Sequence, residues 1–435
     1  MRMHDERRFK AVRNRGRLVS QWWLDGVAPL GGQSFVPLQT HRGELKILTI
    51  HNKYKYRGGE DEVREAEERL LQSRGHQVRP LIFDNEGIRG VSAVVSGLSA
   101  PWSQASYRRT ADEISSWRPD IVSVHNFFPL ATPAVHYAAA RAGVPVVQTL
   151  HNFRLLCPSA VLFRDGGPCE DCLGKIIPWP GIVHACYRQS YSASASAAAM
   201  ITIHNLLKTW QKQVTLFFTL TEFSRQKFIQ GGFPPNRLVV KPNFVPTDLG
   251  PGRGESDFVF YAGRLTEEKG IPLLLKAWRA AKPRGRLLLA GDGPLAPTVR
   301  AFAENTDCIQ YLGQLSMART LEYMGNARAL VFPSLWYEGM PRAIIEAFSR
   351  GTPVIANRCG SMTEMVRHEE TGWLVESGNC GALADAITAA FSEQFDRALM
   401  RSAVRVEFER NYTADRQYDL LMDAYKVVIE AKLLQ

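Results

Sequence analysis

Short apolar runs alternate with amphipathic stretches along most of the chain, beginning at LKILTI (residues 45–50). In the first half the alternation predicts strands over LKILTI, QVRPLIF, DIVSVHN, VPVVQTLHN, TLFFTLT and LVVKPNF. Helices are predicted over residues 60–75 and 106–117, and an alanine-rich helix is predicted over residues 192–203. Strands that alternate with helices in this way are typical of βαβ units, so the first half predicts a parallel sheet.

The same rhythm restarts after VPTDLGPGRGE (residues 246–256), where proline, glycine and charge are concentrated as in a domain linker. Strands are predicted over DFVFYAG, RLLLAG, CIQYLG, ALVFPS, PVIA and GWLVE. Helices are predicted over residues 270–281, 294–305 and 317–325, after 341, near 361–367 and over 413–434. The second half therefore predicts another parallel α/β domain.

A chain of 435 residues is too long for one ordinary core and suits two domains. Residues 1–44 lack sustained periodicity and are interpreted as a basic, disordered extension. An amino-terminal domain over 45–247, a second domain over 255–410 and a terminal helix over 411–435 follow. The predicted fold class is α/β, with two Rossmann-like, doubly wound domains facing each other across a cleft, where such folds bind ligands.

Composition limits the classes of partner that the chain is expected to bind and indicates its cellular compartment. Lys and Arg number 53 against 43 Asp and Glu, which gives a formal net charge of +10. This excess suits nucleic acid, anionic lipid or an anionic small substrate, but no basic helix with interleaved aromatic residues supports nucleic acid. No apolar run approaches the ~18 residues of a membrane span, and the first residues do not resemble a secretory signal. We therefore expect a cytoplasmic protein whose seven cysteines form no structural disulfides.

The stretch VFPSLWYEGMPRAIIEAFSRGTPVIA (residues 331–356) carries the clearest chemical signal. Pro341 suits the first position of a helix that Gly351 ends, so its N-terminus directs free N–H groups at the cleft and favours a phosphate. Glu338 precedes the helix and Glu346 lies inside it, about 7 to 8 Å apart along the axis. Two carboxylates that accept from hydroxyls, on either side of an anion site, fit the sugar, diphosphate and ribose of a nucleotide sugar.

Two further turns agree with that interpretation. YAGRLTEEKG (residues 261–270) supplies Arg264 and Lys269, which could clamp a diphosphate. LLLAGDGPL (residues 287–295) is a glycine-rich turn after a strand. The chain contains no Asp-x-Asp pair, the usual sign of a metal–diphosphate site. A single Glu at a helix start is more often a solvated cap, so the joint spacing of these residues carries the prediction.

GRLTEEKG, AGDGP, FPSLWYEGMPRAIIEA and GTPVIA, in this order, resemble the donor-binding half of family 4 glycosyltransferases, of the bacterial envelope or exopolysaccharide type. These are retaining, metal-independent enzymes of the GT-B fold. The resemblance implies that Glu338 contacts the transferred sugar and Glu346 the ribose, and that Arg264 and Lys269 hold the diphosphate. It also implies that the backbone of Gly339, Met340 and Pro341 approaches the donor, and that the terminal helix crosses back to the first domain.

Signals in the first domain are weaker. Gly58 and Gly59 lie between the first strand and its helix, where backbone N–H groups can approach a phosphate; an ordinary flexible turn is the alternative. His151, at the end of VVQTLHN, matches the family's Thr-x-His position, and the resemblance implies that its imidazole reaches the transferred sugar. His125 and Asn126 end the preceding strand and are further candidates for the cleft.

The implied reaction is hexosyl transfer. An acceptor hydroxyl attacks the anomeric carbon on the face from which the nucleotide leaves, so that the configuration is retained, and no cofactor is expected for catalysis. The expected partners are a UDP- or GDP-linked sugar, a glycan or lipid-linked glycan as acceptor, and the anionic inner face of the cytoplasmic membrane. An epimerase or hydrolase acting on a nucleotide sugar stays open, as does a non-catalytic nucleotide-sugar-binding protein.

A cysteine-rich insertion spans residues 157–188. Four of the seven cysteines lie there, Cys157, Cys169, Cys172 and Cys186, and the middle two form a C-x-x-C. Four thiolates are enough for a closed tetrahedral zinc site, so we expect a structural zinc. Four unlinked thiols and an iron–sulfur cluster stay open as alternatives.

Overall fold

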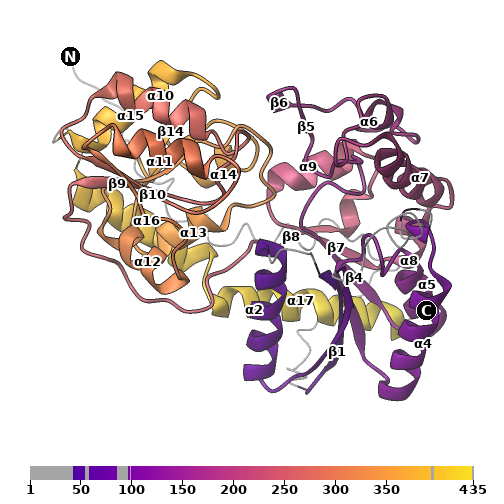
Figure 1. The fold of residues 1–435 in the computed structure, drawn as a ribbon. Coiled ribbons are helices and arrows are strands. Elements are labelled where there is room, and N and C mark those ends of the chain that lie inside the picture. The colour runs from indigo at the N-terminus through magenta and orange to yellow at the C-terminus, as the bar shows by residue number, and fades with distance from the viewer. Residues whose placement is uncertain (1–42, 54–57, 86–96, 98, 393–395, 434–435) are drawn as a thin grey trace, which may run out of the picture.

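A computed structural model describes residues 43–53, 58–85, 97, 99–392 and 396–433 (Figure 1). The predicted basic extension over residues 1–44 lies outside the described residues except for its last two positions. Within the described ranges, no helix is both long enough and apolar enough to cross a membrane.

The first domain contains a parallel sheet in the order β2-β1-β3-β4-β7-β8. Its strands are β1 (Lys46–Lys53), β2 (Gln77–Asp84), β3 (Ile121–Asn126), β4 (Val146–Leu150), β7 (Leu216–Thr219) and β8 (Leu238–Val240). Its helices are α2 (Gly59–Ser73), α4 (Gln104–Trp117), α5 (Ala134–Arg141), α7 (Tyr191–Leu206), α8 (Thr209–Gln213) and α9 (Glu222–Gln230), with a 3₁₀ turn at Pro235–Arg237. Every residue of β4 is buried, as expected of a parallel strand covered on both faces.

The second domain contains a parallel sheet in the order β11-β10-β9-β12-β13-β14. Its strands are β9 (Phe258–Ala262), β10 (Arg286–Ala290), β11 (Ile309–Tyr311), β12 (Leu330–Phe332), β13 (Val354–Asn357) and β14 (Gly372–Val375). Its helices are α10 (Ile271–Ala281), α11 (Ala296–Glu304), α12 (Met317–Asn326), α13 (Arg342–Ser349), α14 (Met362–Met365), α15 (Cys380–Phe391) and α16 (Arg397–Asn411). Residues 246–256 between the domains contain neither helix nor strand.

The predicted fold class of two doubly wound, Rossmann-like domains is confirmed by these sheets. The strand order reverses between β1 and β3 in the first domain and between β9 and β12 in the second. Loops that leave the carboxyl ends of strands at such a reversal form the ligand site of this fold class. The two stretches with the clearest chemistry, after β9 and after β12, both leave the reversal point of the second sheet.

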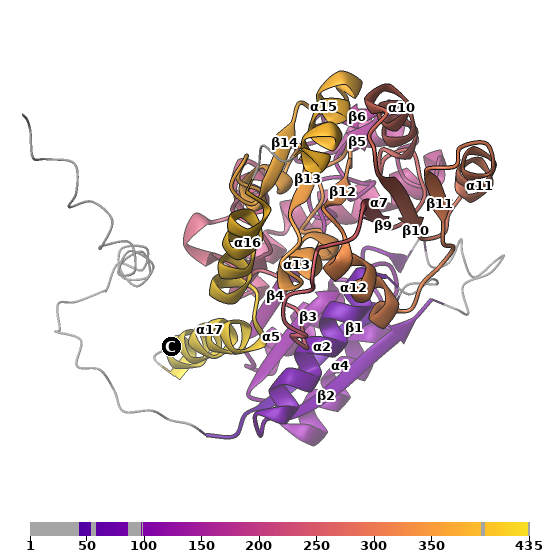
Figure 2. The same cartoon turned by 90° about the vertical axis from the view of Figure 1, so that its left-hand side faces the viewer.

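The last helix, α17 (Ala414–Leu433), follows the second domain in sequence and packs on the first. Its buried residues Leu421, Tyr425 and Val428 join a core cluster with strands of the first sheet. Figures 1 and 2 show α17 running beside α2, below α16 of the second domain. This return of the chain crosses between the domains beside the linker, where the Val245 N–H donates to the Tyr412 oxygen over 3.0 Å.

Several elements differ from the predicted ones. Helix α13 begins at Arg342 rather than Pro341, because Pro341 keeps an extended backbone and caps the helix. Four helices were not predicted: α5, α9, α15 and α16. In the alanine-rich helices α5 and α15, apolar and polar positions contrast too weakly to show a helical period. The cysteine-rich insertion contains a two-stranded hairpin, β5 (Phe163–Arg164) and β6 (Gly167–Pro168), and a short helix, α6 (Trp179–Val183).

Candidate active site

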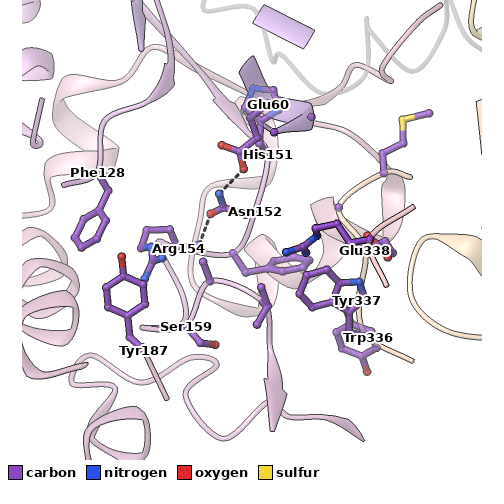
Figure 3. Close-up of a pocket in the computed structure, with 18 of the residues that line it drawn as sticks. Glu60, Phe128, His151, Asn152, Arg154, Ser159, Tyr187, Trp336, Tyr337 and Glu338 are labelled. Atoms are coloured by element: carbon purple, nitrogen blue, oxygen red, sulfur yellow. Dashed lines mark hydrogen bonds between the residues drawn. The ribbon is translucent and has the colours of Figure 1, made fainter. Parts of the chain in front are cut away.

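A cleft of about 1750 Å³ opens between the domains at the carboxyl ends of their strands (Figure 3). The residues predicted for catalysis and donor binding all line it: Gly58, Gly59, His151, Arg264, Lys269, Glu338, Gly339, Met340, Pro341 and Glu346. They come from both domains and from segments far apart in the sequence. The structure therefore places them in one site, while their individual roles stay predictions.

Glu338 is buried at the base of the second-domain wall of the cleft. Lys269 Nζ and Ser334 Oγ donate hydrogen bonds to its Oε1 over 2.6 and 2.7 Å. The Lys269 ammonium also lies 5.2 Å from the centre of the Trp336 ring. Only one carboxylate oxygen of Glu338 is thus engaged by these donors, and Oε2 is available to accept from a sugar hydroxyl. Because Lys269 is paired with Glu338, the two residues predicted for different parts of the donor act as one unit.

Gly339 lies at a close approach between the backbones of the two domains. A Cβ at this position would lie 2.5 Å from the backbone oxygen of His151, a distance that no side chain could accept without a shift of backbone. Thr221 Oγ1 and Ser224 Oγ, both in the first domain, donate to the Gly339 oxygen over 3.4 Å. Glycine is therefore required here because the strand end that carries His151 touches the loop that carries Glu338.

Glu346 lies on the first turns of α13 with its carboxylate buried. Arg342 Nη2 lies 2.9 Å from Glu346 Oε1 without hydrogen-bond geometry, and Arg342 also pairs with Glu62 of α2 across the cleft. Burial raises the pKa of Glu346, and the neighbouring Arg342 opposes that rise. The carboxylate is thus incompletely satisfied by the protein, as expected of a group that accepts hydrogen bonds from a ligand.

The Gly58–Gly59 turn opens α2 on the opposite wall. Asp61 Oδ2 accepts from the Gly58 N–H over 2.9 Å, and Asp61 Oδ1 lies 2.9 Å from His51 Nε2. Burial opposes ionisation of Asp61, but the hydrogen bonds from His51 and Gly58 outweigh it and lower the pKa of this carboxyl. The Gly58 N–H already donates to Asp61, so within this glycine pair the Gly59 N–H is the donor that can bind a phosphate.

Arg264 is the most exposed of the predicted cations. Its side chain is 64% exposed, and its nearest carboxylate oxygen, on Glu268, lies 3.8 Å away. The guanidinium lies 5.8 Å from the centre of the Trp336 ring. At such exposure the contact with Glu268 is weak, so Arg264 can turn toward an anion in the cleft.

Sequence reasoning missed several lining residues of the first domain. The Arg154 guanidinium lies 4.7 Å from the Phe128 ring centre and 4.5 Å from that of Tyr187 (Figure 3). Asn152 Nδ2 donates to Glu60 Oε1 over 2.7 Å. These residues follow strand ends or lie in the insertion, and only their proximity to His151 in the sequence could have suggested Asn152 and Arg154.

His125 and Asn126 are not where the sequence suggested. Neither lines the cleft. His125 is buried behind His151, with its Nδ1 3.1 Å from His151 Nε2. Asn126 donates to the backbone oxygen of Asn52 over 2.8 Å and accepts from the Phe128 N–H, so it holds two strand ends together. One strand end reaches the cleft and its neighbour does not, a difference that the two similar motifs VHN and LHN do not reveal.

The cysteine-rich insertion borders the cleft and contacts the loop before Glu338. Tyr337 Oη donates to Glu170 Oε1 over 2.9 Å, and Lys227 Nζ lies 2.7 Å from the same oxygen. The Phe163 and Trp336 rings meet edge to face at 6.5 Å. Glu170 stands between the two cysteines of the C-x-x-C, so this motif is tied to the donor side of the site.

All four cysteines of the insertion are free thiols. Burial, reinforced mainly by Cys157, raises the pKa of the Cys172 thiol to about 12. In the described part of the chain, no group of three or more His, Cys, Asp or Glu side chains is arranged to hold a metal ion. The structural zinc therefore stays a prediction without support from this side-chain arrangement.

Comparison with family models places both halves of the chain. A model described as Glycosyltransferase Family 4 matches residues 58–249, and one described as Glycosyl transferases group 1 matches residues 251–406. The two matches meet within the linker between the domains.

Two similar proteins are named as bacterial glycosyltransferases of polysaccharide biosynthesis. The chain is 24% identical to the amylovoran biosynthesis glycosyltransferase AmsK of Erwinia amylovora over 48% of this chain and 56% of AmsK. It is 22% identical to the putative teichuronic acid biosynthesis glycosyltransferase TuaC of Bacillus subtilis over 72% of each. The match to AmsK thus covers little more than half of that protein.

Solved structures show the same fold at low identity. Anabaena HepE in complex with UDP has a TM-score of 0.62 at 15% identity, over 88% of this chain and 100% of that one. Sucrose-phosphate synthase from Thermosynechococcus elongatus has a TM-score of 0.64 at 17% identity, over 89% and 100%. The predicted GT-B architecture is confirmed by these likenesses.

Replacing Glu346 by glutamine should stabilise the protein at neutral to alkaline pH. Because burial raises the pKa of Glu346 above its unfolded value, stability falls as pH rises through the folded pKa. A neutral glutamine avoids that loss, so we expect a higher free energy of unfolding than in the parent near pH 8, and a smaller difference near pH 4, where the Glu346 carboxyl is mostly protonated. Urea unfolding at both pH values measures it. Glu322→Gln, on the surface of α12, is the control without effect; equal stability of Glu346→Gln and the parent near pH 8 would refute the prediction.

The zinc prediction is tested by elemental analysis of protein purified without chelator. We expect about one zinc per chain, and we expect the double variant Cys169→Ser, Cys172→Ser to lose it. The matched control is Cys308→Ser, Cys380→Ser, which lies outside the insertion and should keep the metal. Metal-free protein with four titratable thiols in the insertion and an unchanged melting temperature would end this prediction in favour of unlinked thiols.

Proposed function

The chain belongs to glycosyltransferase family 4, and we propose that it is a retaining hexosyltransferase that moves a sugar from a nucleoside-diphosphate sugar to an acceptor hydroxyl. The observation that carries the proposal is the convergence of Glu338, Glu346, Arg264 and Lys269 with His151 in one cleft between two Rossmann-like domains. This set contains acceptors for sugar and ribose hydroxyls and cations for a diphosphate, which are the parts of a nucleotide sugar.

The donor is proposed to be UDP- or GDP-linked. Structures of Anabaena HepE hold UDP and UDP-glucose, which supports a nucleoside diphosphate in this fold. In this chain Glu346 would accept from the ribose and Glu338 from the transferred sugar. The N-terminus of α13, after Pro341, directs its N–H groups at the same cleft, where they would bind phosphate oxygens.

Transfer would proceed with retention. The bond from the anomeric carbon to the diphosphate oxygen breaks as the bond to the acceptor oxygen forms on the same face, and the acceptor proton leaves with the diphosphate. Charge develops on the leaving oxygen. Arg264 is the cation best able to take up that charge, because Lys269 is partly compensated by Glu338. The absence of an Asp-x-Asp pair in the sequence supports a donor site that relies on these cations.

The size of the cleft favours transfer over hydrolysis or epimerisation. A pocket for one small ligand measures roughly 300 to 1000 Å³, and this cleft measures about 1750 Å³. The additional space extends along Arg154, Tyr187 and the small residues Ala193, Ser196 and Ala199 of α7. We assign this first-domain half to the acceptor, a glycan or lipid-linked glycan, consistent with relatives named for polysaccharide biosynthesis.

Contact with the inner face of an anionic membrane is also proposed. The insertion exposes Ile176, Ile177, Trp179 and Val183 to between 54% and 58%. Lys175 and Arg188 are exposed beside them. Apolar side chains with an aromatic ring and neighbouring basic residues suit the headgroup region of an anionic bilayer, and this surface adjoins the proposed acceptor half of the cleft.

The donor assignment predicts different defects for two alanine variants. Glu346→Ala should weaken binding of the nucleotide sugar, while Arg264→Ala should mainly lower turnover. Loss of a hydrogen bond to a charged group costs about 1.5–3 kcal/mol, on the order of tenfold to a hundredfold. Calorimetric titration with a panel of UDP- and GDP-sugars and assays of nucleotide release measure both quantities.

Arg319→Ala, at an exposed position on α12, is the control without effect. Unchanged binding and turnover in both test variants would remove the donor assignment. Release of free sugar at the full rate with donor alone would favour a hydrolase. Tight binding without any turnover, with glycan acceptors present, would favour the non-catalytic binder.

The membrane proposal predicts sedimentation with vesicles containing phosphatidylglycerol at low salt. Each basic residue near an anionic surface contributes about 1 kcal/mol, which salt screens. Replacing Ile176 and Trp179 by serine should reduce binding about tenfold or more, because burial of large apolar side chains is lost. Leu399→Ser, at an exposed apolar position on the second domain, is the control. Equal sedimentation of both variants, or none of the parent protein, would contradict the proposal.

A further inference from the structure

Three neighbouring strands of the first sheet each carry a histidine at their carboxyl end. His51 lies in β1, His125 in β3, and His151 follows β4. All three are buried, and only His151 lines the cleft. The proposed reaction uses His151 and gives no reason for His125, so the contacts behind the cleft require an explanation of their own.

Two buried charges lie behind His125. Lys241, which follows β8, is fully buried, and its Nζ lies 2.6 Å from Oε2 of Glu67, a buried residue of α2. The other carboxylate oxygen, Oε1, lies 3.5 Å from His125 Nε2. His125 Nδ1 in turn lies 3.1 Å from His151 Nε2, with the two rings stacked at 5.3 Å. A continuous polar chain therefore runs from Lys241 through Glu67 and His125 to the cleft.

The ionisation states along this chain follow from burial and charge. Burial disfavours the Glu67 carboxylate, but Lys241 and His125 outweigh it and hold the pKa of Glu67 far below its usual range. Burial lowers the pKa of His125, and it lowers that of His151 well below its ordinary value. Glu67 is therefore a carboxylate that can only accept, and both imidazoles are neutral, each with one N–H and one acceptor nitrogen.

These states fix where each proton lies. A lone pair on His125 Nε2 would face the Glu67 carboxylate and be repelled, so the proton lies on Nε2 even though the contact is longer than an ordinary hydrogen bond. His125 Nδ1 is then an acceptor, and the His151 proton must lie on Nε2. Nδ1 of His151 makes no hydrogen bond within the described residues, and it is not among their buried polar atoms that lack a partner, so it is not sealed off from the cleft. It is the atom left for the cleft.

We propose that Lys241, Glu67 and His125 are positioning residues that hold His151 as its Nε2–H tautomer, with Nδ1 accepting a hydrogen bond from a hydroxyl of the bound sugar. This inference rests on the proposed function for the identity of that ligand, but the tautomer itself does not depend on it. Outer contacts of this kind commonly set which imidazole nitrogen is protonated. Burying an ion pair such as Lys241–Glu67 is costly and adds little to fold stability. Fixing the tautomer of His151 gives this pair a role at the site.

In the isosteric variant Glu67→Gln, we expect His151 to adopt the opposite tautomer from that in the parent protein. Glutamine has one acceptor oxygen, which turns toward the Lys241 ammonium because an NH₂ group there would face another donor. The amide NH₂ therefore faces His125 Nε2. His125 would then carry its proton on Nδ1 and donate to His151 Nε2, leaving His151 protonated on Nδ1. In His125→Asn, a side-chain oxygen can replace the acceptor Nδ1, so His151 should keep the parent tautomer.

The test is ¹⁵N nuclear magnetic resonance of imidazole nitrogens in the full chain, with His151 assigned by its loss in His151→Gln. We expect an unprotonated Nδ1 for His151 in the parent and in His125→Asn, and a protonated Nδ1 in Glu67→Gln. The matched control is Glu68→Gln, which alters a buried carboxylate of the same helix that bonds to Thr49 and Arg64 instead. Glu68→Gln should leave the His151 signal unchanged.

Titration with UDP- and GDP-sugars completes the experiment, and we expect Glu67→Gln to bind the donor about tenfold more weakly, the size of one hydrogen bond. A protonated Nδ1 on His151 in the parent protein, or an unchanged tautomer in folded Glu67→Gln, overturns the proposal. If Glu67→Gln does not fold, the parent spectrum and His125→Asn still decide it. If the expected tautomers are observed but no nucleotide sugar binds, the positioning chain is supported and the proposed function is contradicted.

Discussion

The contact between Gly339 and the backbone oxygen of His151 sets the geometry of the site. A Cβ on Gly339 would come within 2.5 Å of that oxygen, so the end of β4 and the loop before α13 touch without any side chain between them. Neighbouring bonds hold the same alignment. Glu364 accepts from the N–H groups of Glu222 and Phe223 at the start of α9, over 3.0 and 2.9 Å. The relative position of the two domains at this point thus follows from one backbone contact and from side chains that bond to the backbone of the other domain, and the cleft lies where the domains diverge.

Around that contact the protein keeps charges that do not favour folding. Glu346 is buried with an incompletely satisfied carboxylate. Lys269 and Glu338 face each other at the second-domain wall of the cleft, and Lys241 and Glu67 form a buried pair behind the first-domain wall. Buried ion pairs contribute little net stability compared with apolar packing. Their concentration on both sides of the cleft distinguishes this region from the apolar cores of the two sheets and supports its assignment as a ligand site.

The fold and the second-domain site were predictable for the same reason: their determinants are local in the sequence. Buried parallel strands appear as apolar runs, and Glu338, Gly339 and Glu346 lie on one continuous strand–loop–helix segment. The first-domain site was less predictable because Arg154, Tyr187 and Asn243 reach the cleft from separate segments. His125 was misplaced because a strand end facing the cleft and one buried behind it have the same sequence character. The three-dimensional register of β3 against β4, which no periodicity encodes, decides between them.

The insertion connects the two halves of the cleft in a way that the sequence did not suggest. Its hairpin places Glu170 where Tyr337 and Lys227 both reach it, so one carboxylate is shared by the donor loop and by α9 of the first domain. Phe163 of the same hairpin packs against Trp336, whose ring also lies under Lys269. Tyr337 and Trp336 immediately precede Glu338. A displacement of the hairpin would therefore change the aromatic surface beside the Lys269–Glu338 pair, so Glu170 and Phe163 couple the insertion to the donor loop whether or not the neighbouring cysteines bind a metal.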